Sequence, residues 1–232
     1  DFITATAGSP AEAVTAIQLL GSDVLIRPGQ WDVENIGFRD TTYVSASGNG
    51  GWVVFGEGSR SPTGRVIMYE ANADVISGGI AVDDLLINGS ETVRGVGLNY
   101  DGTLGVALGS LEAAFFSTDL RLQGTALITP GASGAVLHPL HANSKSVDNP
   151  TGLYQPDTHM AFVGSGDLTI DIIDTQTWTV TKKIPLTDHP NNLAITPDGS
   201  KVYVAIARAP GALDVIDTAS QERIRTISVH GG

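Results

Sequence analysis

Histidines are the residues of this chain whose chemistry first suggests a metal centre. The chain has five of them: His138, His141, His159, His189 and His230. In the motif HPLH, His138 and His141 are three residues apart, and on a helix that spacing brings two imidazoles together. In a strand, residues three apart point to opposite faces, and zinc and copper sites use three or more converging ligands. The sequence therefore favours a turn at His138, and we expect no bound metal and no other cofactor.

Paired aspartates form a second group of residues with possible chemistry. Asp171 and Asp174 make one pair, and Asp214 and Asp217 make another. Two carboxylates at such a spacing could bind Ca²⁺ or act as a general acid and base. Both pairs occupy the same place in a repeated segment, so a structural role in each repeat explains them better. The sequence has no G-x-S-x-G motif and no recognisable Ser/His/Asp set, and we predict no catalytic residue.

The repeated segment is marked by two IDT motifs, whose first residues Ile173 and Ile216 lie 43 residues apart. Four-stranded propeller blades repeat at about 40–45 residues. The last repeat predicts strands at residues 192–196, 201–207, 211–217 and 223–229. Pro197 and Gly199 suit the PDGS turn between the first two strands, and Asp217 can accept hydrogen bonds from backbone amides of the turn after the third. The motif residues are therefore predicted to make turns.

The same order of strands can be followed back towards the N-terminus. The preceding repeat predicts strands at 135–139, 160–164, 168–174 and 180–185, and the one before it begins with RGVGLNYDG at 94–102. An earlier repeat starts with VENIGFRD at 33–40, continues with GWVVFGEG and GRVIMYEANAD, and ends with a strand near 79–85. Residues 1–30 hold three strands, at 2–8, 13–19 and 23–29. We therefore predict an all-β fold, a β-propeller with four complete four-stranded antiparallel blades and one three-stranded N-terminal blade.

The whole chain is expected to be a single propeller domain or a large part of one. The approximate blade limits are 1–30, 31–88, 89–131, 132–187 and 188–232. The chain starts at Asp1 rather than Met and its first blade lacks a strand, so we expect a processed or trimmed piece of a propeller with six or seven blades.

The last two repeats resemble the YVTN-type β-propeller repeat, which is found in surface-layer-type proteins. The resemblance rests on Pro190, on LAITPDGSKVYVA and on the VIDT that follows, and it covers about residues 168–229. Thr196 stands where the repeat usually has Ser. The resemblance implies a radial fold that is often extracytoplasmic and serves as a scaffold. Propellers with related repeats also include lactonase-like and redox enzymes, so the fold by itself assigns no activity.

Composition excludes several classes of protein. The net charge is −12 and Lys and Arg are not clustered, so a nucleic-acid partner is not expected. The chain has no cysteine, which excludes disulfides and thiolate chemistry. No apolar run approaches the ~18 residues of a membrane helix, so we predict no transmembrane segment in this chain.

Function is expected to reside in irregular segments rather than in the repeat. Two polar stretches, at 40–50 and 141–158, are predicted to be surface loops. The candidate interaction residues are Leu153 and Tyr154 in the second loop, and Trp31, Arg60, His189, Asn191 and Arg208 near the axial funnel. We expect a non-catalytic periplasmic or extracellular scaffold, or an accessory subunit, whose partner is another protein. The alternatives are a propeller enzyme of lactonase-like or metal-assisted redox type and, with less support, a carbohydrate-binding module.

Overall fold

The computed structural model describes residues 2–6, 13–20, 23–32, 41–57, 65–73, 75–81, 93–138 and 159–229, with strands β1 to β3 described by their backbone. All regular secondary structure in these residues is β-strand. None of the described segments is a helix that could span a membrane.

The strands form five antiparallel sheets in chain order, which we number blades 1 to 5. Blade 1 has three strands, β1 (Phe2–Thr6), β2 (Ala13–Leu20) and β3 (Asp23–Asp32). Blade 2 has β4 (Thr41–Ala46), β5 (Trp52–Glu57), β6 (Arg65–Glu70) and β7 (Val75–Ala81). Blade 3 has β8 (Gly95–Leu98), β9 (Gly105–Leu108), β10 (Glu112–Phe116) and β11 (Leu122–Leu127).

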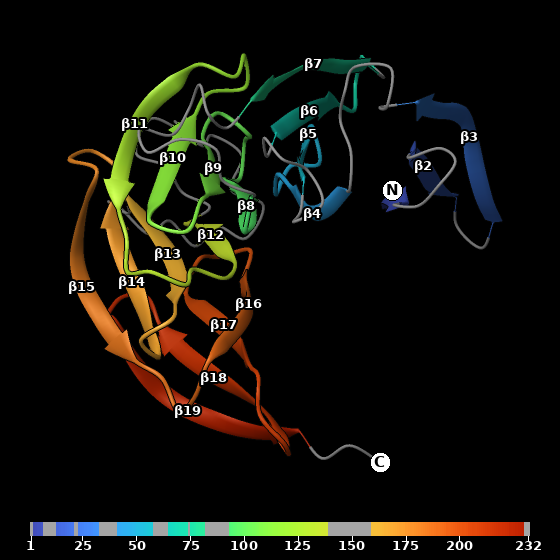
Figure 1. The fold of residues 1–232 in the computed structure, drawn as a ribbon. Helices are drawn as coiled ribbons and strands as arrows, with labels where there is room; N and C mark the ends of the chain where they lie inside the picture. The colour runs from blue at the N-terminus through green and yellow to red at the C-terminus, as the bar shows by residue number, and fades with distance from the viewer. Residues whose placement is uncertain are drawn as a thin grey trace.

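The last two blades follow the same order. Blade 4 has β12 (Ala135–Leu137), β13 (Met160–Ser165), β14 (Thr169–Asp174) and β15 (Thr179–Pro185). Blade 5 has β16 (Pro190–Ile195), β17 (Lys201–Ile206), β18 (Gly211–Asp217) and β19 (Glu222–Val229). Figure 1 shows the blades around an arc, with the first strand of each four-stranded blade towards the centre and the fourth on the outside. The predicted fold of four complete blades and one three-stranded blade is therefore confirmed.

The strand prediction was wrong in blade 2. Its first strand is β4, within the segment at 40–50 that was predicted to be a surface loop, and its fourth strand is β7 at Val75–Ala81 rather than near 79–85. The sequence TTYVSA of β4 is polar, but Thr, Tyr and Val are favoured in strands, and pairing with the apolar strand β5 fixes it in the sheet. The predicted strand at 33–40 and the predicted loop at 141–158 lie outside the described residues.

Blades 3, 4 and 5 share an irregularity that aligns them residue by residue. Each has a register shift between its third and fourth strands, at Phe115/Phe116, Ile172/Ile173 and Val215/Ile216. A bulge at a fixed place in successive sheets gives equivalent positions. On this alignment Asp171 and Asp214 are equivalent, and blade 3 has the buried Ala114 at that position.

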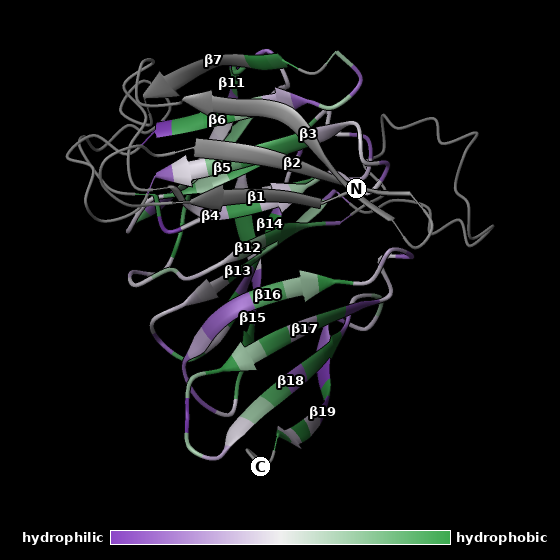
Figure 2. Cartoon of the chain, turned by 90° about the vertical axis from the view of Figure 1, so that its right-hand side faces the viewer, coloured by the Kyte–Doolittle hydropathy of each residue, from purple (hydrophilic) through white to green (hydrophobic). Residues whose placement is uncertain are grey.

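The core lies between blades, where the face of one sheet packs on the face of the next. Between blades 3 and 4, Phe115 and Val163 are fully buried, and the ring of Trp178 lies 5.0 Å from the ring of Phe115. Between blades 4 and 5, Phe162 and Ile172 pack against aliphatic residues of β17. Figure 2 shows hydrophobic residues recurring along strands β17 and β18 of the last blade.

Candidate functional site

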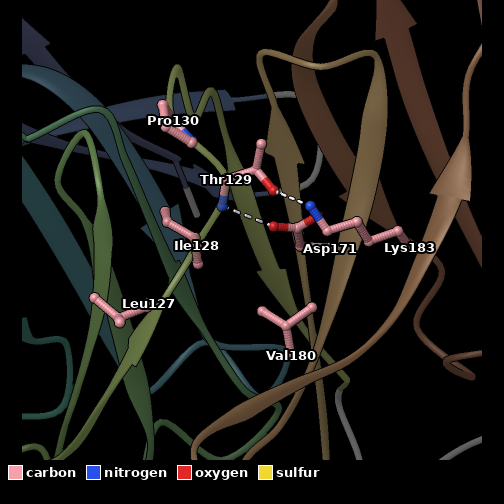
Figure 3. A pocket seen from close by; sticks show the side chains of 7 residues that line it. All are labelled: Leu127, Ile128, Thr129, Pro130, Asp171, Val180 and Lys183. Atoms are coloured by element: carbon pink, nitrogen blue, oxygen red, sulfur yellow. Dashed lines mark hydrogen bonds and ion pairs between the residues drawn. The ribbon is translucent and has the colours of Figure 1, made fainter.

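A pocket of about 310 Å³ opens on the outer flank of the molecule between blades 3 and 4. Its walls come from the end of β11 and the connection after it on one side, and from β14 and β15 on the other (Figure 3). The lining residues are Leu127, Ile128, Thr129, Pro130, Asp171, Val180 and Lys183. The pocket therefore combines an apolar wall with a carboxylate and an ammonium group.

The polar groups of this pocket are joined to one another by hydrogen bonds and ion pairs. The fully buried Asp171 accepts a hydrogen bond of 2.9 Å at Oδ2 from the backbone N–H of Thr129, which belongs to the preceding blade. Lys183 Nζ lies 3.8 Å from the other oxygen, Oδ1, and donates a hydrogen bond to Thr129 Oγ1. The same ammonium group is 3.4 Å from Asp167 Oδ2. Buried carboxylates need such donors, and here they tie two blades together.

Blade 5 repeats this arrangement with different residues. Asp214 Oδ2 accepts hydrogen bonds from Thr187 N at 2.7 Å and from Thr187 Oγ1 at 2.9 Å, and Thr187 lies just after the last strand of blade 4. Its Oδ1 accepts a hydrogen bond of 2.6 Å from Thr226 Oγ1, and Arg223 Nη1 is 3.6 Å away. The prediction that the aspartate pairs have a repeated structural role is therefore confirmed for Asp171 and Asp214.

The second aspartate of each pair, Asp174 or Asp217, stabilises a turn. Asp217 Oδ1 accepts hydrogen bonds from Ser220 N at 2.8 Å and Ser220 Oγ at 2.9 Å, which lower the pKa of its carboxyl. Asp174 Oδ1 accepts from the backbone N–H groups of Gln176 at 2.8 Å and Thr177 at 2.9 Å. Both carboxylates cap the turn between the third and fourth strands, as the sequence predicted.

The PDGS turn is held by its own aspartate. Asp198 Oδ1 accepts hydrogen bonds from Thr196 Oγ1 at 2.6 Å, Ser200 N at 3.0 Å and Ser200 Oγ at 2.9 Å. These donors, with the hydroxyl of Thr196 the strongest, lower the pKa of Asp198 to about 2. Gly199 follows with a positive φ of 69°, and a Cβ there would overlap the imidazole of the buried His138. This turn of blade 5 therefore packs closely against blade 4.

One exposed leucine lines the pocket, and two more lie in turns that are linked to it by backbone hydrogen bonds. Leu127 is 72% exposed, and Leu111 and Leu168 are also exposed at the turns before β10 and β14. The backbone of Leu111 accepts a hydrogen bond from Ile128 N at 2.9 Å, and Gly166 N donates to Pro130 O at 3.0 Å, so these turns meet at one edge of the molecule. We name Leu111, Leu127 and Leu168 the leucine edge. Since the carboxylate already has its donors, this edge offers a ligand mainly apolar contact.

Three of the predicted interaction residues lie together on blade 5. His189 precedes β16 and Arg208 follows β17, and a backbone hydrogen bond of 2.8 Å from Ala207 N to His189 O joins these two ends. Asn191 is exposed on β16. Trp31 lies on β3, where the backbone alone is described, while Arg60, Leu153 and Tyr154 lie outside the described residues. Their role in binding stays a prediction.

The described histidines belong to no cluster of metal-binding side chains. The backbone N–H of His138 donates to Met160 O at 2.9 Å, and His159 Nε2 shares a hydrogen bond of 2.7 Å with Gln176 Nε2. In the part of the chain that the structure describes, no group of three or more His, Cys, Asp or Glu side chains could hold a metal ion.

Sequence reasoning missed the leucine edge and the partners of the buried aspartates. Thr129 is 42 residues from Asp171, and nothing in the local sequence links them. The available signal was the recurrence of Thr after the last strand of a blade, in LITPG and in PLTDH, ahead of each aspartate.

Comparison with known proteins supports the fold without naming a family. No family model and no curated protein matches the chain. Among solved structures 1274 chains match, so the architecture is too widespread to assign a function. Kuenenia stuttgartiensis hydrazine synthase is 17% identical with a TM-score of 0.61, over 82% of this chain and 49% of that one.

A second solved structure also shares the architecture of this chain at low sequence identity. The β-propeller domain of Myceliophteria thermophila Cps50 (Swd1) is 14% identical with a TM-score of 0.56, over 83% of this chain and 56% of that one. This chain thus spans about half the length of each of these structures. At such low identity the likeness concerns architecture alone, and it agrees with the blades described above: the chain has a β-propeller fold.

Proposed function

We propose that this propeller is a protein-interaction scaffold, or an accessory subunit of a larger assembly, and that the leucine edge is one of its contact surfaces. The proposal rests on one observation: an exposed apolar side chain lies beside buried polar groups that already have partners. The buried polar groups of the pocket are held by each other, while Leu127 beside them is 72% exposed. Exposed apolar side chains gathered next to a concave surface are typical of protein-binding sites.

Site-specific photo-cross-linking tests this proposal. A photoreactive residue is placed at Leu127 or Leu168, and for comparison at Ile224, which is 53% exposed on the outer strand of blade 5. In an extract of the source organism, the first two positions are expected to give one discrete cross-linked protein and Ile224 none. Equal labelling from all three positions, or none from Leu127 and Leu168, would contradict the proposal.

The resemblance to YVTN-type repeats supports two finer proposals. We infer membership of that repeat family from LAITPDGSKVYVA, whose residues form the end of β16, the turn after it and most of β17. We also propose a periplasmic or extracellular location, which such propellers often have. Cell fractionation with antibodies against the folded chain tests the location, and recovery in the cytosolic fraction would contradict it.

The competing proposal, a lactonase-like or metal-assisted redox enzyme, lacks a specific observation in its favour among the described residues. Metal analysis of the purified chain distinguishes the two proposals. An ion bound in a 1:1 ratio to the chain would favour the enzyme.

A further inference from the structure

The outer strand of blade 3, β11, has one edge that no described strand covers. Its sheet has the order β11-β10-β9-β8, and Figure 1 shows β11 on the outside of the arc. Ile128 N–H donates to Leu111 O at 2.9 Å. In an antiparallel ladder such bonded positions alternate with positions whose backbone groups point away from the partner strand. Thr125 and Leu127 are of the second kind, so each directs an N–H and a C=O to the open edge.

The three outer strands whose side chains are described throughout differ in charge. Strand β15 has two lysines in TVTKKIP, and β19 has two arginines in ERIRTISV. Charged side chains on an edge strand hinder its pairing with a further strand. Strand β11, with the sequence LQGTAL, has no charged residue, and its end residues Leu122 and Leu127 are 44% and 72% exposed. Of these three strands, β11 is therefore the one suited to pair with another strand.

A strand added to this edge runs beside the pocket between blades 3 and 4. Ala126 of β11 belongs to the core between these blades, and Ile128 and Val180 line the pocket. Successive side chains of a strand point to opposite faces, and those of paired strands lie side by side on the same face. Every second side chain of an added strand therefore lies on the side of the apolar wall. Aliphatic or β-branched residues suit these positions.

The charged groups at the pocket determine which charge a partner can bring. Asp171 and Asp167 provide two carboxylates and Lys183 one ammonium group, so one negative charge is in excess. The side chain of Asp167 is 45% exposed. Its turn is joined to the residues after β11 by the hydrogen bond from Gly166 N to Pro130 O. In a chain with a net charge of −12, this excess favours a partner with Lys or Arg and disfavours one with Asp or Glu.

We propose that the partner at the leucine edge contributes an extended segment that pairs with β11 and becomes a fifth strand of blade 3. The segment belongs to another protein, has aliphatic or β-branched residues at alternate positions and carries a basic residue at the end beside Asp167. Main-chain hydrogen bonds with Thr125 and Leu127 supply affinity, and the pocket supplies selectivity. This inference rests on the proposed function and adds how the partner binds.

Selection from a phage-displayed library of random peptides tests the proposal without the natural partner. The unaltered chain is expected to enrich peptides with alternating β-branched residues and a Lys or Arg. Thr125→Pro removes one outward N–H but none of the bonds to β10, and it is expected to weaken binding of a selected peptide about tenfold. Thr125→Val keeps the N–H and is expected to bind like the unaltered chain. Equal binding by the two variants, or no enrichment, would overturn the proposal.

Methylation of the peptide tests the pairing independently of any change in the fold of the Thr125→Pro variant. A methyl group is placed on one backbone nitrogen of the selected peptide at a time. Only alternate N–H groups of an added strand face β11, so binding is expected to be lost at every second position and kept at the positions between. Loss at all positions, or at none, would overturn the proposal.

The charge of the partner is tested with a matched pair of substitutions. Asp167→Asn is expected to weaken binding of the selected peptide several-fold. Glu222→Gln removes an exposed carboxylate on β19 and is expected to have no effect. Equal effects of the two substitutions would contradict the basic residue.

Two further results separate this inference from the proposed function. If cross-linking from Leu127 to a protein of the extract persists in the Thr125→Pro variant, the scaffold stands and the added strand is overturned. If peptides bind as expected but Leu127 cross-links to no protein, the proposed function fails alone. Sedimentation of the unaltered chain as a dimer that Thr125→Pro dissociates would make a second copy the occupant and would overturn the inference.

Discussion

Asp171 and Asp214 each hold the backbone amide of a threonine in the preceding blade, so each carboxylate acts on the contact between two blades. Replacing Asp214 with Ala leaves the N–H of Thr187 without its acceptor and removes the ion pair with Arg223. Loss of one partner in a buried charged network costs about 3–5 kcal/mol, and we expect the free energy of unfolding to fall by that order. Urea unfolding measures it. Asp174→Ala, in an exposed turn, is the control and is expected to cost about 1 kcal/mol.

The lowered pKa of Asp198 predicts a stability contribution that depends on pH. Its carboxyl has a pKa of about 2 when folded, against about 3.9 for an unfolded aspartate. The contribution is complete above about pH 4 and is lost as the pH falls towards 2. After allowance for partial exposure, it is about 1–2 kcal/mol. Asp198→Ala is expected to destabilise the chain by that amount in urea at pH 7, and the difference from the unaltered chain should shrink at pH 2. A difference that stays constant with pH would contradict this account.

A glycine in strand β11 allows a tryptophan of the next blade to pack closely against the strand. A Cβ on Gly124 would overlap the indole of Trp178, which packs against Phe115 with the two rings tilted by 37°. Gly124→Ala therefore displaces the indole, and the overpacking is expected to cost about 1–3 kcal/mol in urea unfolding and to shift tryptophan fluorescence. In a Trp178→Leu background the same substitution should cost much less. If the two costs are equal, the glycine does not act through Trp178.

Most strands could be predicted from the sequence, and the exceptions have physical reasons. The strands of blades 4 and 5 are short, mostly apolar or β-branched runs between clear turns, and their predicted limits lie within two residues of those observed, as for β16 and β19. Strand β4 was missed because TTYVSA lacks an apolar face, and its pairing with β5 decides its structure. The leucine edge was missed because it gathers turns from two blades that only the packed fold brings together.

The open arc predicts a difference between two identical residues. Ile184 and Ile227 occupy equivalent positions in blades 4 and 5, and Ile184 is 2% exposed whereas Ile227 is partly exposed. Truncation of a buried Ile to Ala costs about 2–5 kcal/mol, because it removes apolar contact and leaves a cavity. Ile184→Ala is expected to fall in that range in urea unfolding, and Ile227→Ala to cost about 1 kcal/mol. Equal losses would show that the side chain of Ile227 is covered as fully as that of Ile184.

The order of the sheets along the chain also has a kinetic consequence. Each blade is built from one continuous stretch of sequence, and the described four-stranded blades pack on their neighbours in chain order. Most contacts therefore form between segments close in sequence, which lowers the entropy lost on the way to the folded state. Blade formation can proceed stepwise along the polypeptide. Conversely, the last blade packs on one neighbour among the described blades, so it can open while the others stay folded. Exchange of its backbone amides with solvent is then expected to report local rather than global unfolding.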